Sequence, residues 1–199
     1  MSDEYVTVAG EGHASFKDRG SEFVGYVAPA SHEDDAKGYV ENVRDEHADA
    51  THHVSAYRVR DDGAVRGIYD DDGEPSGSAG KPVLEVLRGE EVENVVAVVV
   101  RYYGGTKLGY GGLVSAYSET AKRALNDAGT RVDVPRTELR VEVEYDDSGT
   151  ARDVLESEGV PFDAEYEESV VFTVRPPAGD LDALKDRLLS ATSGRARLS

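Results

Sequence analysis

Two glycine-rich segments, residues 71–82 and 102–113, carry the residue types and spacing that best fit a binding site. Together they hold eight glycines, and each segment leads into a predicted helix. The first amides of a helix have no partner within it, so they attract anions and carbonyl oxygens. Glycine also lets a partner approach the backbone closely. The segments therefore predict a binding site, and the alternative is that the glycines only permit tight turns and close packing.

Basic and polar side chains in and beside these segments complete the predicted site. Arg101 ends a predicted strand, Lys107 lies in the second segment, and Lys81 lies at a helix start. Arginine can engage phosphates, and Tyr102 can stack on a base. The candidate contacts for a ligand or partner are His52, Arg58, Glu74, Ser76, Gly77, Ser78, Gly80, Lys81, Arg101, Tyr102, Gly104, Gly105, Lys107, Gly109, Gly111 and Gly112.

Known catalytic motifs do not fit these residues. A phosphate-binding P-loop needs glycine and a hydroxyl residue where this chain has Pro75 and Pro82. A nucleophile elbow needs glycine on both sides of serine, whereas Ser76 has Glu74 and Ser78 at those positions. We therefore assign no catalytic residue. A hydrolase that acts on a small phosphorylated or peptide substrate, with His52 or Glu74 as the acid–base group, remains the alternative.

No metal or cofactor is predicted. His52 and His53 are adjacent on a predicted strand, so their side chains point to opposite faces and at most one can join a cluster. The aspartates at 70–72 are interpreted as a solvated turn. The chain has no cysteine, which excludes disulfide scaffolds, thiolate zinc sites, iron–sulfur clusters and cysteine nucleophiles.

The charge is strongly acidic, with 22 basic and 40 acidic residues and a net charge of −18. An acidic, lysine-poor surface suits a cytoplasm kept at molar salt, where charge repulsion is screened, and the alternative is an ordinary acidic protein. No apolar stretch approaches a membrane span, and the acidic start at residues 1–4 is unlike a secretory signal. We therefore expect a halophilic, cytoplasmic protein with no membrane partner.

The negative charge avoids the middle of the chain. Residues 1–72 have 17 acids and 7 bases, and residues 137–199 have 15 and 7. Residues 95–125 carry four bases and a single acid, Glu119. This middle segment is either buried or reserved for a partner that avoids negative charge.

Hydrophobic periodicity predicts two α+β domains. In residues 1–130 we expect a helix from Ser31 to about Ala50, strands at 54–60 and 64–69 joined by a turn at 61–63, and helices at 83–88 and 113–128. Residues 95–101 predict a strand that is buried on both faces. Residues 131–136 are expected to be a linker. Residues 137–199 show a β-α-β-β-α order, which fits a ferredoxin-like sandwich.

Three stretches, residues 50–58, 71–82 and 98–113, resemble the Impact family in its bacterial and archaeal YigZ-like branch. The resemblance covers residues 15–130, while the remainder is similar only in length and element order. It implies a domain of the ribosomal-protein-S5 domain-2-like type followed by a ferredoxin-like α/β sandwich. This pair is similar to the last two domains of elongation factor G, which contact the ribosome.

The resemblance also implies a link to translation, because eukaryotic members act in translational control. Our hypothesis is a non-catalytic binding protein linked to translation or its regulation, which uses the glycine-rich face to bind RNA, the ribosome or a translation-associated protein. No DNA partner is expected. The net negative charge opposes tight nucleic-acid binding, so a protein partner stays open beside RNA. An interaction scaffold with purely structural glycines is the third possibility.

Overall fold

The computed structural model describes residues 4–61 and 64–199. It divides into two compact units, an N-terminal one over Tyr5–Asp133 and a C-terminal one over Val134–Ser199. Both are α+β, as predicted from the sequence. Among the described residues, no helix has both the length and the apolar composition that crossing a lipid bilayer requires.

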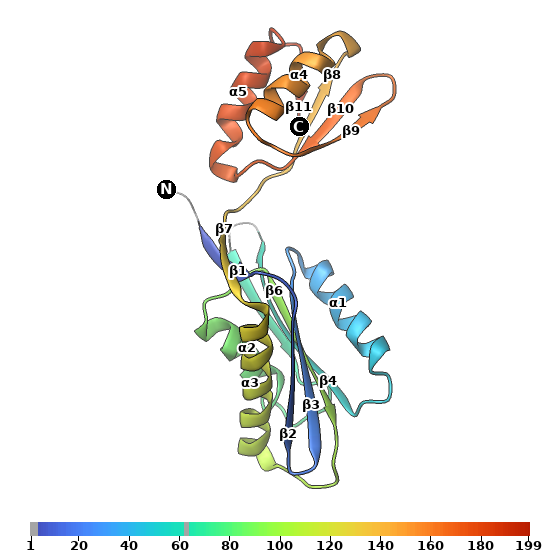
Figure 1. Ribbon diagram of the computed structural model, residues 1–199, viewed down its shortest axis with the longest axis vertical. Helices are drawn as coiled ribbons and strands as arrows, with labels where there is room; N and C mark the ends of the chain where they lie inside the picture. Colours follow the sequence, from blue (N-terminus) through green and yellow to red (C-terminus); the bar gives the residue numbers. More distant parts are fainter. Residues whose placement is uncertain (1–3, 62–63) are drawn as a thin grey trace. The chain divides into compact units, whose positions relative to one another are not determined.

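A five-stranded antiparallel sheet forms the centre of the N-terminal domain (Figure 1). Its order is β2 (Gly12–Asp18), β3 (Ser21–Pro29), β6 (Val95–Tyr102), β4 (His52–Asp61) and β5 (Ala64–Asp70). The middle strand β6 is fully buried from Val95 to Val100, with alternate side chains in two separate hydrophobic clusters. The prediction of a strand buried on both faces is confirmed.

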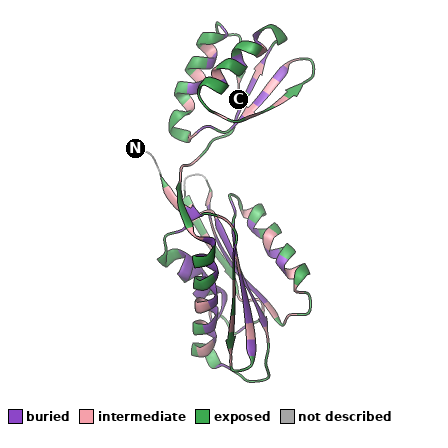
Figure 2. Ribbon diagram, viewed as in Figure 1, coloured by how far each residue is buried: buried purple, intermediate pink, exposed green. Residues whose placement is uncertain are grey.

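Helices cover both faces of this sheet, so the domain has three layers (Figures 1 and 2). On one face lie α2 (Gly80–Gly89) and α3 (Gly109–Ala128), and on the other lies α1 (Glu33–Glu46). A separate ribbon pairs β1 (Tyr5–Val8) with β7 (Thr130–Asp133). The arrangement is that of a ribosomal-protein-S5 domain-2-like domain.

Several boundaries differ from the sequence predictions. The first helix is capped at His32 rather than at Ser31, because the Asp35 carboxylate accepts hydrogen bonds from both backbone amides. Helices α2 and α3 begin three and four residues earlier than predicted, so residues 109–112 are helical rather than part of a loop. Residues 131–133 of the expected linker belong to β7. The turn expected at 61–63 includes residues 62 and 63, which lie outside the described residues.

The C-terminal domain has the ferredoxin-like strand order. Its elements are β8 (Leu139–Val143), α4 (Tyr145–Ser157), β9 (Phe162–Tyr166), β10 (Val170–Val174), the short 3-10 helix η1 (Ala178–Asp180), α5 (Leu181–Ala191) and β11 (Arg197–Leu198). The sheet order is β11-β8-β10-β9, with all neighbours antiparallel. The two-residue strand β11 was not predicted, because it is too short to show periodicity. Arg195, just before it, makes two hydrogen bonds to the Asp147 carboxylate and so ties the chain end to α4.

Close backbone contact between α3 and the sheet gives a prediction about Gly12. A Cβ atom at Gly12 would lie 2.1 Å from the Ala124 carbonyl oxygen. Gly12→Ala should therefore lower the free energy of unfolding by about 1–3 kcal/mol, as overpacking does. A matched control is Gly38→Ala on α1, where an added Cβ meets no atom within 4 Å. That variant should be neutral or more stable by up to about 1 kcal/mol, because alanine is the better helix former. Equal urea denaturation curves for the two variants would contradict the close contact.

Candidate functional site

The two glycine-rich segments meet at one end of the N-terminal sheet. Both β5 and β6 run antiparallel to β4, so they end at the same edge, and the segments follow these ends. The Tyr110 hydroxyl donates a hydrogen bond to the Gly77 carbonyl at 3.1 Å, which joins the two segments directly. The sequence analysis assigned both segments to one candidate site, and in the folded domain they are in contact.

The amide end of α2 is already occupied by a carboxylate of the chain. The Asp71 side chain accepts hydrogen bonds from the backbone amides of Gly77, Ala79 and Gly80, at 2.7, 3.1 and 2.8 Å. The expectation that these amides are free for an anion is therefore wrong. Asp71 was interpreted as part of a solvated turn. Its position before a glycine-rich helix start was the signal that it could act as a cap.

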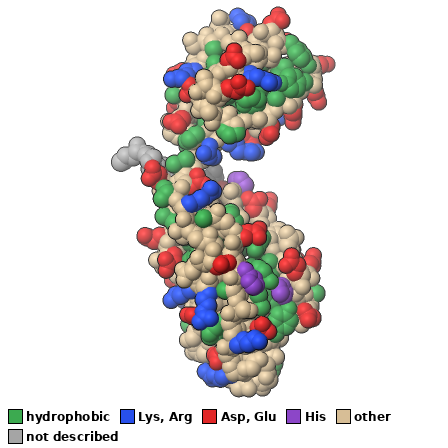
Figure 3. Space-filling model, in the orientation of Figure 1, with side chains coloured by type: hydrophobic (Ala, Val, Ile, Leu, Met, Phe, Trp, Pro, Cys, Tyr) green, Lys and Arg blue, Asp and Glu red, His purple; other side chains and the backbone are tan. Residues whose placement is uncertain are grey.

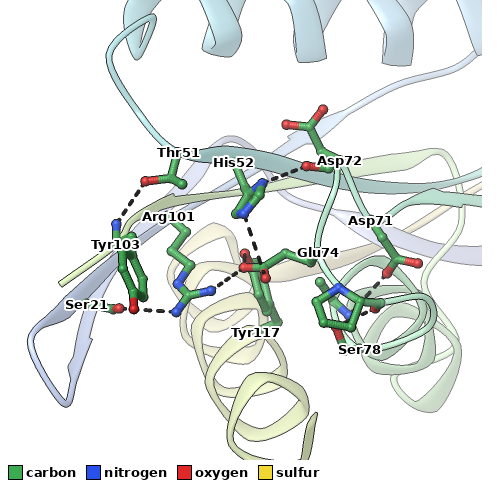
Figure 4. A network of polar contacts seen from close by, with 12 residues as sticks. Ser21, Thr51, His52, Asp71, Asp72, Glu74, Ser78, Arg101, Tyr103 and Tyr117 are labelled. Carbon is green, nitrogen blue, oxygen red and sulfur yellow. Dashed lines mark hydrogen bonds and ion pairs between the residues drawn. The ribbon is translucent and has the colours of Figure 1, made fainter. Parts of the chain in front are cut away.

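Behind this loop lies a buried polar network (Figure 4). The Arg101 guanidinium donates to Glu74 Oε1 at 2.6 Å, and the Tyr117 hydroxyl donates to the same oxygen at 2.7 Å. Ser21 Oγ accepts from Arg101 at 3.3 Å. Arg101 is 4% exposed and Glu74 is 8% exposed. Both were candidate contacts, but the structure uses them to hold the first segment against the sheet.

Two aromatic rings enclose the Arg101 side chain. Its guanidinium carbon lies 5.5 Å from the centre of the Phe23 ring and 5.3 Å from that of Tyr103. Cation–π contacts of this kind are favourable when they exclude water. They add to the burial of Arg101, so its charge is balanced inside the protein by Glu74 rather than offered to a ligand.

The adjacent histidines of β4 also bind the first segment. His52 Nδ1 lies 2.7 Å from the Asp72 carbonyl oxygen, so this nitrogen carries a proton, and Nε2 lies 3.8 Å from Glu74 Oε2. His53 Nε2 donates to the His47 carbonyl oxygen at 2.7 Å, and its backbone amide donates to the Asp72 carboxylate. The two side chains thus act from opposite faces of the strand, as predicted.

Ser78, which has glycine (Gly80) at only one of the two positions that a nucleophile elbow requires, makes a hydrogen bond within its own loop. Ser78 is fully buried, and its hydroxyl donates to the Pro75 carbonyl at 2.6 Å. Ser78 is therefore a turn residue rather than an accessible contact. Ser76 and Lys81, by contrast, are exposed.

Two further candidate residues have structural partners. Arg58 donates to the carbonyls of Leu87 and Val92 near the end of α2, and it lies six residues along β4 from His52, about 20 Å away. It is not part of the site. The Tyr102 hydroxyl lies 2.6 Å from His47 Nδ1, on the α1 side of the sheet. Side chains alternate between the two faces of a strand, so the accessible ring beside the loop is that of Tyr103 and not that of Tyr102, which was predicted to stack on a base.

Most of the candidate glycines are required by the fold. A Cβ would lie 2.6 Å from the Asp70 carbonyl oxygen at Gly80 and 1.9 Å from the Gly20 carbonyl carbon at Gly104. At Gly112 it would lie 3.0 Å from the Leu108 Cβ. Positive φ angles of 76°, 86° and 73° favour glycine at Gly77, Gly105 and Gly109. Gly111 has neither constraint, since a Cβ there would meet no atom within 4 Å. Packing or backbone conformation therefore explains all of these glycines except Gly111.

The exposed cations at this end come from segments far apart in the sequence. Lys17 and Arg19 flank the β2–β3 turn, and the Arg19 guanidinium lies 3.5 Å from the Leu108 carbonyl oxygen, beside Lys107. Asp18, between them in the sequence, forms an ion pair with Arg19 at 3.6 Å. We call Lys17, Arg19 and Lys107 the basic tip. Figure 3 shows Lys and Arg side chains at the lower end of the N-terminal domain. Lys17 and Arg19 were missed, because nothing local in the sequence links them to the second segment.

The amide end of α3 adjoins the basic tip and has no side-chain cap within the part of the chain that the structure describes. Its cap residue is Leu108, which has no side-chain acceptor, and its first turn contains no acidic residue. Gly109, Tyr110 and Gly111 in this turn are exposed. The expectation of free helix amides is therefore wrong for the first segment, and for the second it stays a prediction that the lack of a side-chain cap at Leu108 supports.

Comparison with known proteins covers both domains. Residues 19–125 match the Impact N-terminal domain, and residues 141–195 match a domain of unknown function, DUF1949. The chain is 38% identical to IMPACT family member YigZ of Escherichia coli over 89% of this chain and 88% of that protein. It belongs to the IMPACT family. Another IMPACT family member, YvyE of Bacillus subtilis, is 32% identical over 98% of this chain and 90% of its own length.

A solved structure agrees with this assignment. A crystal structure of a hypothetical protein, 34% identical, covers 100% of this IMPACT family chain and 97% of its own, with a TM-score of 0.77. A structure described as the two-domain translational regulator Yih1 is 29% identical and covers 61% of this chain and 48% of its own, with a TM-score of 0.38.

The buried network predicts how Arg101 variants behave. Arg101→Met should lower the free energy of unfolding by about 3–5 kcal/mol, because it leaves the Glu74 carboxylate buried without its cation. Adding Glu74→Gln should restore much of that stability. The control Lys107→Met changes an exposed lysine and should alter stability little. Urea denaturation measures all four proteins, and a fully stable Arg101→Met protein would contradict the structural role.

Tyr117 predicts an alkaline dependence of stability. Burial and the hydrogen bond to Glu74 raise the pKa of Tyr117 far above its ordinary value. The unfolded chain releases this proton at about pH 10, whereas the folded chain retains it. The stabilisation is therefore complete below about pH 10 and decreases as the pH rises above it. Tyr117→Phe should reduce the fall in unfolding free energy between about pH 9 and about pH 11. The exposed-residue control, Tyr69→Phe, should leave that fall unchanged.

Proposed function

We propose that this IMPACT family member is a non-catalytic RNA-binding protein linked to translation regulation, and that the basic tip contacts RNA phosphates. One observation carries the proposal. Exposed cations from two distant segments lie at the end of the domain where α3 begins, in a chain whose net charge is −18. The Arg19 guanidinium, which also pairs with Asp18 at 3.6 Å, lies 3.5 Å from the Leu108 carbonyl oxygen, and Lys107 precedes that residue. Both features favour an anion, and they occupy the same end of the domain.

The negative charge of the rest of the molecule limits where RNA can contact the protein. A polyanion is repelled by an acidic surface, so contact is favourable only where the acids are absent. The second segment meets this condition, because residues 102–113 contain one lysine and no acid, and the one acid within the adjoining turn, Asp18, is paired with Arg19. The exposed Gly111 adds no side chain to this surface, which leaves the helix amides accessible.

The link to translation rests on family membership. Eukaryotic members of the family act in translational control, and the yeast protein named Protein IMPACT homolog is 31% identical over 46% of this chain and 36% of its own length. The two domains are also similar to the last two domains of elongation factor G, which contact the ribosome, and this similarity supports a link to translation. The hydrolase alternative gains no support from the geometry, since Ser78 is buried and His52 is bound to the Asp72 carbonyl.

The test compares two triple variants with the same change in charge. Lys17→Ala/Arg19→Ala/Lys107→Ala removes the basic tip, and Arg66→Ala/Arg88→Ala/Arg131→Ala removes exposed arginines elsewhere on the domain. RNA affinity, measured by fluorescence anisotropy over a range of salt, should fall at least about tenfold in the tip variant. The slope of log affinity against log salt should fall by about 0.7 for each phosphate that the variant no longer neutralises. Equal effects of the two variants would contradict the proposal.

A further inference from the structure

A groove between α2 and α3 lies next to the open end of α3. It encloses about 580 Å³, which lies within the range of small-ligand sites. Every fourth residue of α3 lines it, from Tyr110 through Val114 and Ser118 to Lys122, and Lys81 and Val86 line it from α2. The groove thus follows α3 for three turns, about 18 Å.

Tyr110 stands at the mouth of this groove with its ring in solvent. It is 58% exposed, among the highest values for large hydrophobic side chains in the described part of the chain. Its hydroxyl is held by the Gly77 carbonyl, so one edge of the ring is fixed while most of its surface is uncovered. The flanking residues Gly109 and Gly111 have no side chains to shield it.

Two lysines at the groove provide positive charge. Lys81 lies in the first turn of α2, and Lys122 lies three turns along α3 from Tyr110. Neither lysine has an ion-pair partner within residues 4–61 and 64–199. Their neighbours Arg88 and Arg123, by contrast, are paired with Glu85 and Glu119 at 2.7 Å.

We propose that this groove binds single-stranded RNA, with a base stacked on Tyr110 and phosphates held by Lys81 and Lys122. The inference rests on the proposed function and specifies the form of RNA that the site takes. Stacking requires an unstacked base, which a single strand offers and a duplex does not. A ring fixed at one edge, in a groove that also carries a cation near the ring and another three turns away, provides the stacking platform and basic groove that single strands use.

Stacking also suits the charge of this chain. Phosphate contacts weaken steeply with salt, while stacking on an aromatic ring is far less dependent on it. Two carboxylates line the same groove. Glu85 is neutralised by Arg88, whereas Glu90 lies at the end of α2 and opposes a phosphate chain there. Stacking on Tyr110 therefore has to supply a large share of the affinity.

The experiment uses the full chain and one labelled RNA, as a single strand and annealed to its complement. The wild type should prefer the single strand. Tyr110→Leu should weaken single-strand binding about tenfold with little change in salt slope, because it removes stacking rather than charge. Tyr110→Phe keeps the ring and should retain most of the affinity. Lys81→Ala/Lys122→Ala should lower the salt slope by about 1.4, the value for two single-strand phosphates.

The outcomes separate this inference from the proposed function. If Tyr110→Leu binds the single strand as tightly as the wild type, or if the duplex binds equally well, the groove assignment is wrong. The basic-tip variant still tests RNA binding in that case. If the groove accommodates a protein helix instead, the tyrosine and lysine variants leave RNA binding unchanged, which also overturns the proposal. Equal melting temperatures of Tyr110→Leu and Tyr110→Phe show that the comparison reports on binding rather than on folding.

Discussion

Arg101 lies at the end of the central strand, where its side chain enters the protein interior, and a charge in that position has to be balanced inside the fold. Glu74 supplies the balance from the first glycine-rich segment, and Tyr117 on α3 binds the same carboxylate oxygen. A strand, a loop and a helix are thereby fixed relative to one another by a single carboxylate. Because an unpaired buried charge is so unfavourable, the loop has little freedom to leave this position.

This constraint divides the polar residues of the two segments into two groups. Inward-facing polar groups, such as the half-buried Asp71 and the buried Ser78, satisfy backbone donors and acceptors and shape the first segment. Exposed groups, such as Lys107 and Tyr110, remain available to a partner. The rigid group holds the accessible group in place, since the Tyr110 hydroxyl is bonded to Gly77 in the loop that Asp71 organises. Such preorganisation reduces the entropy that a partner loses on binding.

The charge pattern gains a structural meaning in this arrangement. Acidic residues dominate both ends of the sequence, while the central segment supplies the buried strand β6 and the neighbouring helix α3. Burial explains the lack of acids in the strand. It does not explain their absence from residues 102–113, most of which are exposed. A surface kept free of negative charge beside open helix amides is what an anionic partner requires.

The sequence by itself determined the α+β class and the buried strand at 95–101, because hydrophobic periodicity is a local signal. It only suggested that the two glycine-rich segments meet, since a contact between distant segments is decided by the sheet that ends beside both of them. It could not determine which polar residues face inward. Nothing in the sequence around Glu74 or Arg101 distinguishes a buried side chain from an exposed one. Only the packing of β6, the first glycine-rich segment and α3 against one another encloses them. Lys17 and Arg19 join Lys107 for the same reason, since the β2–β3 turn reaches the second segment only in the folded chain. Tertiary structure therefore decided which groups support the site and which are left to bind.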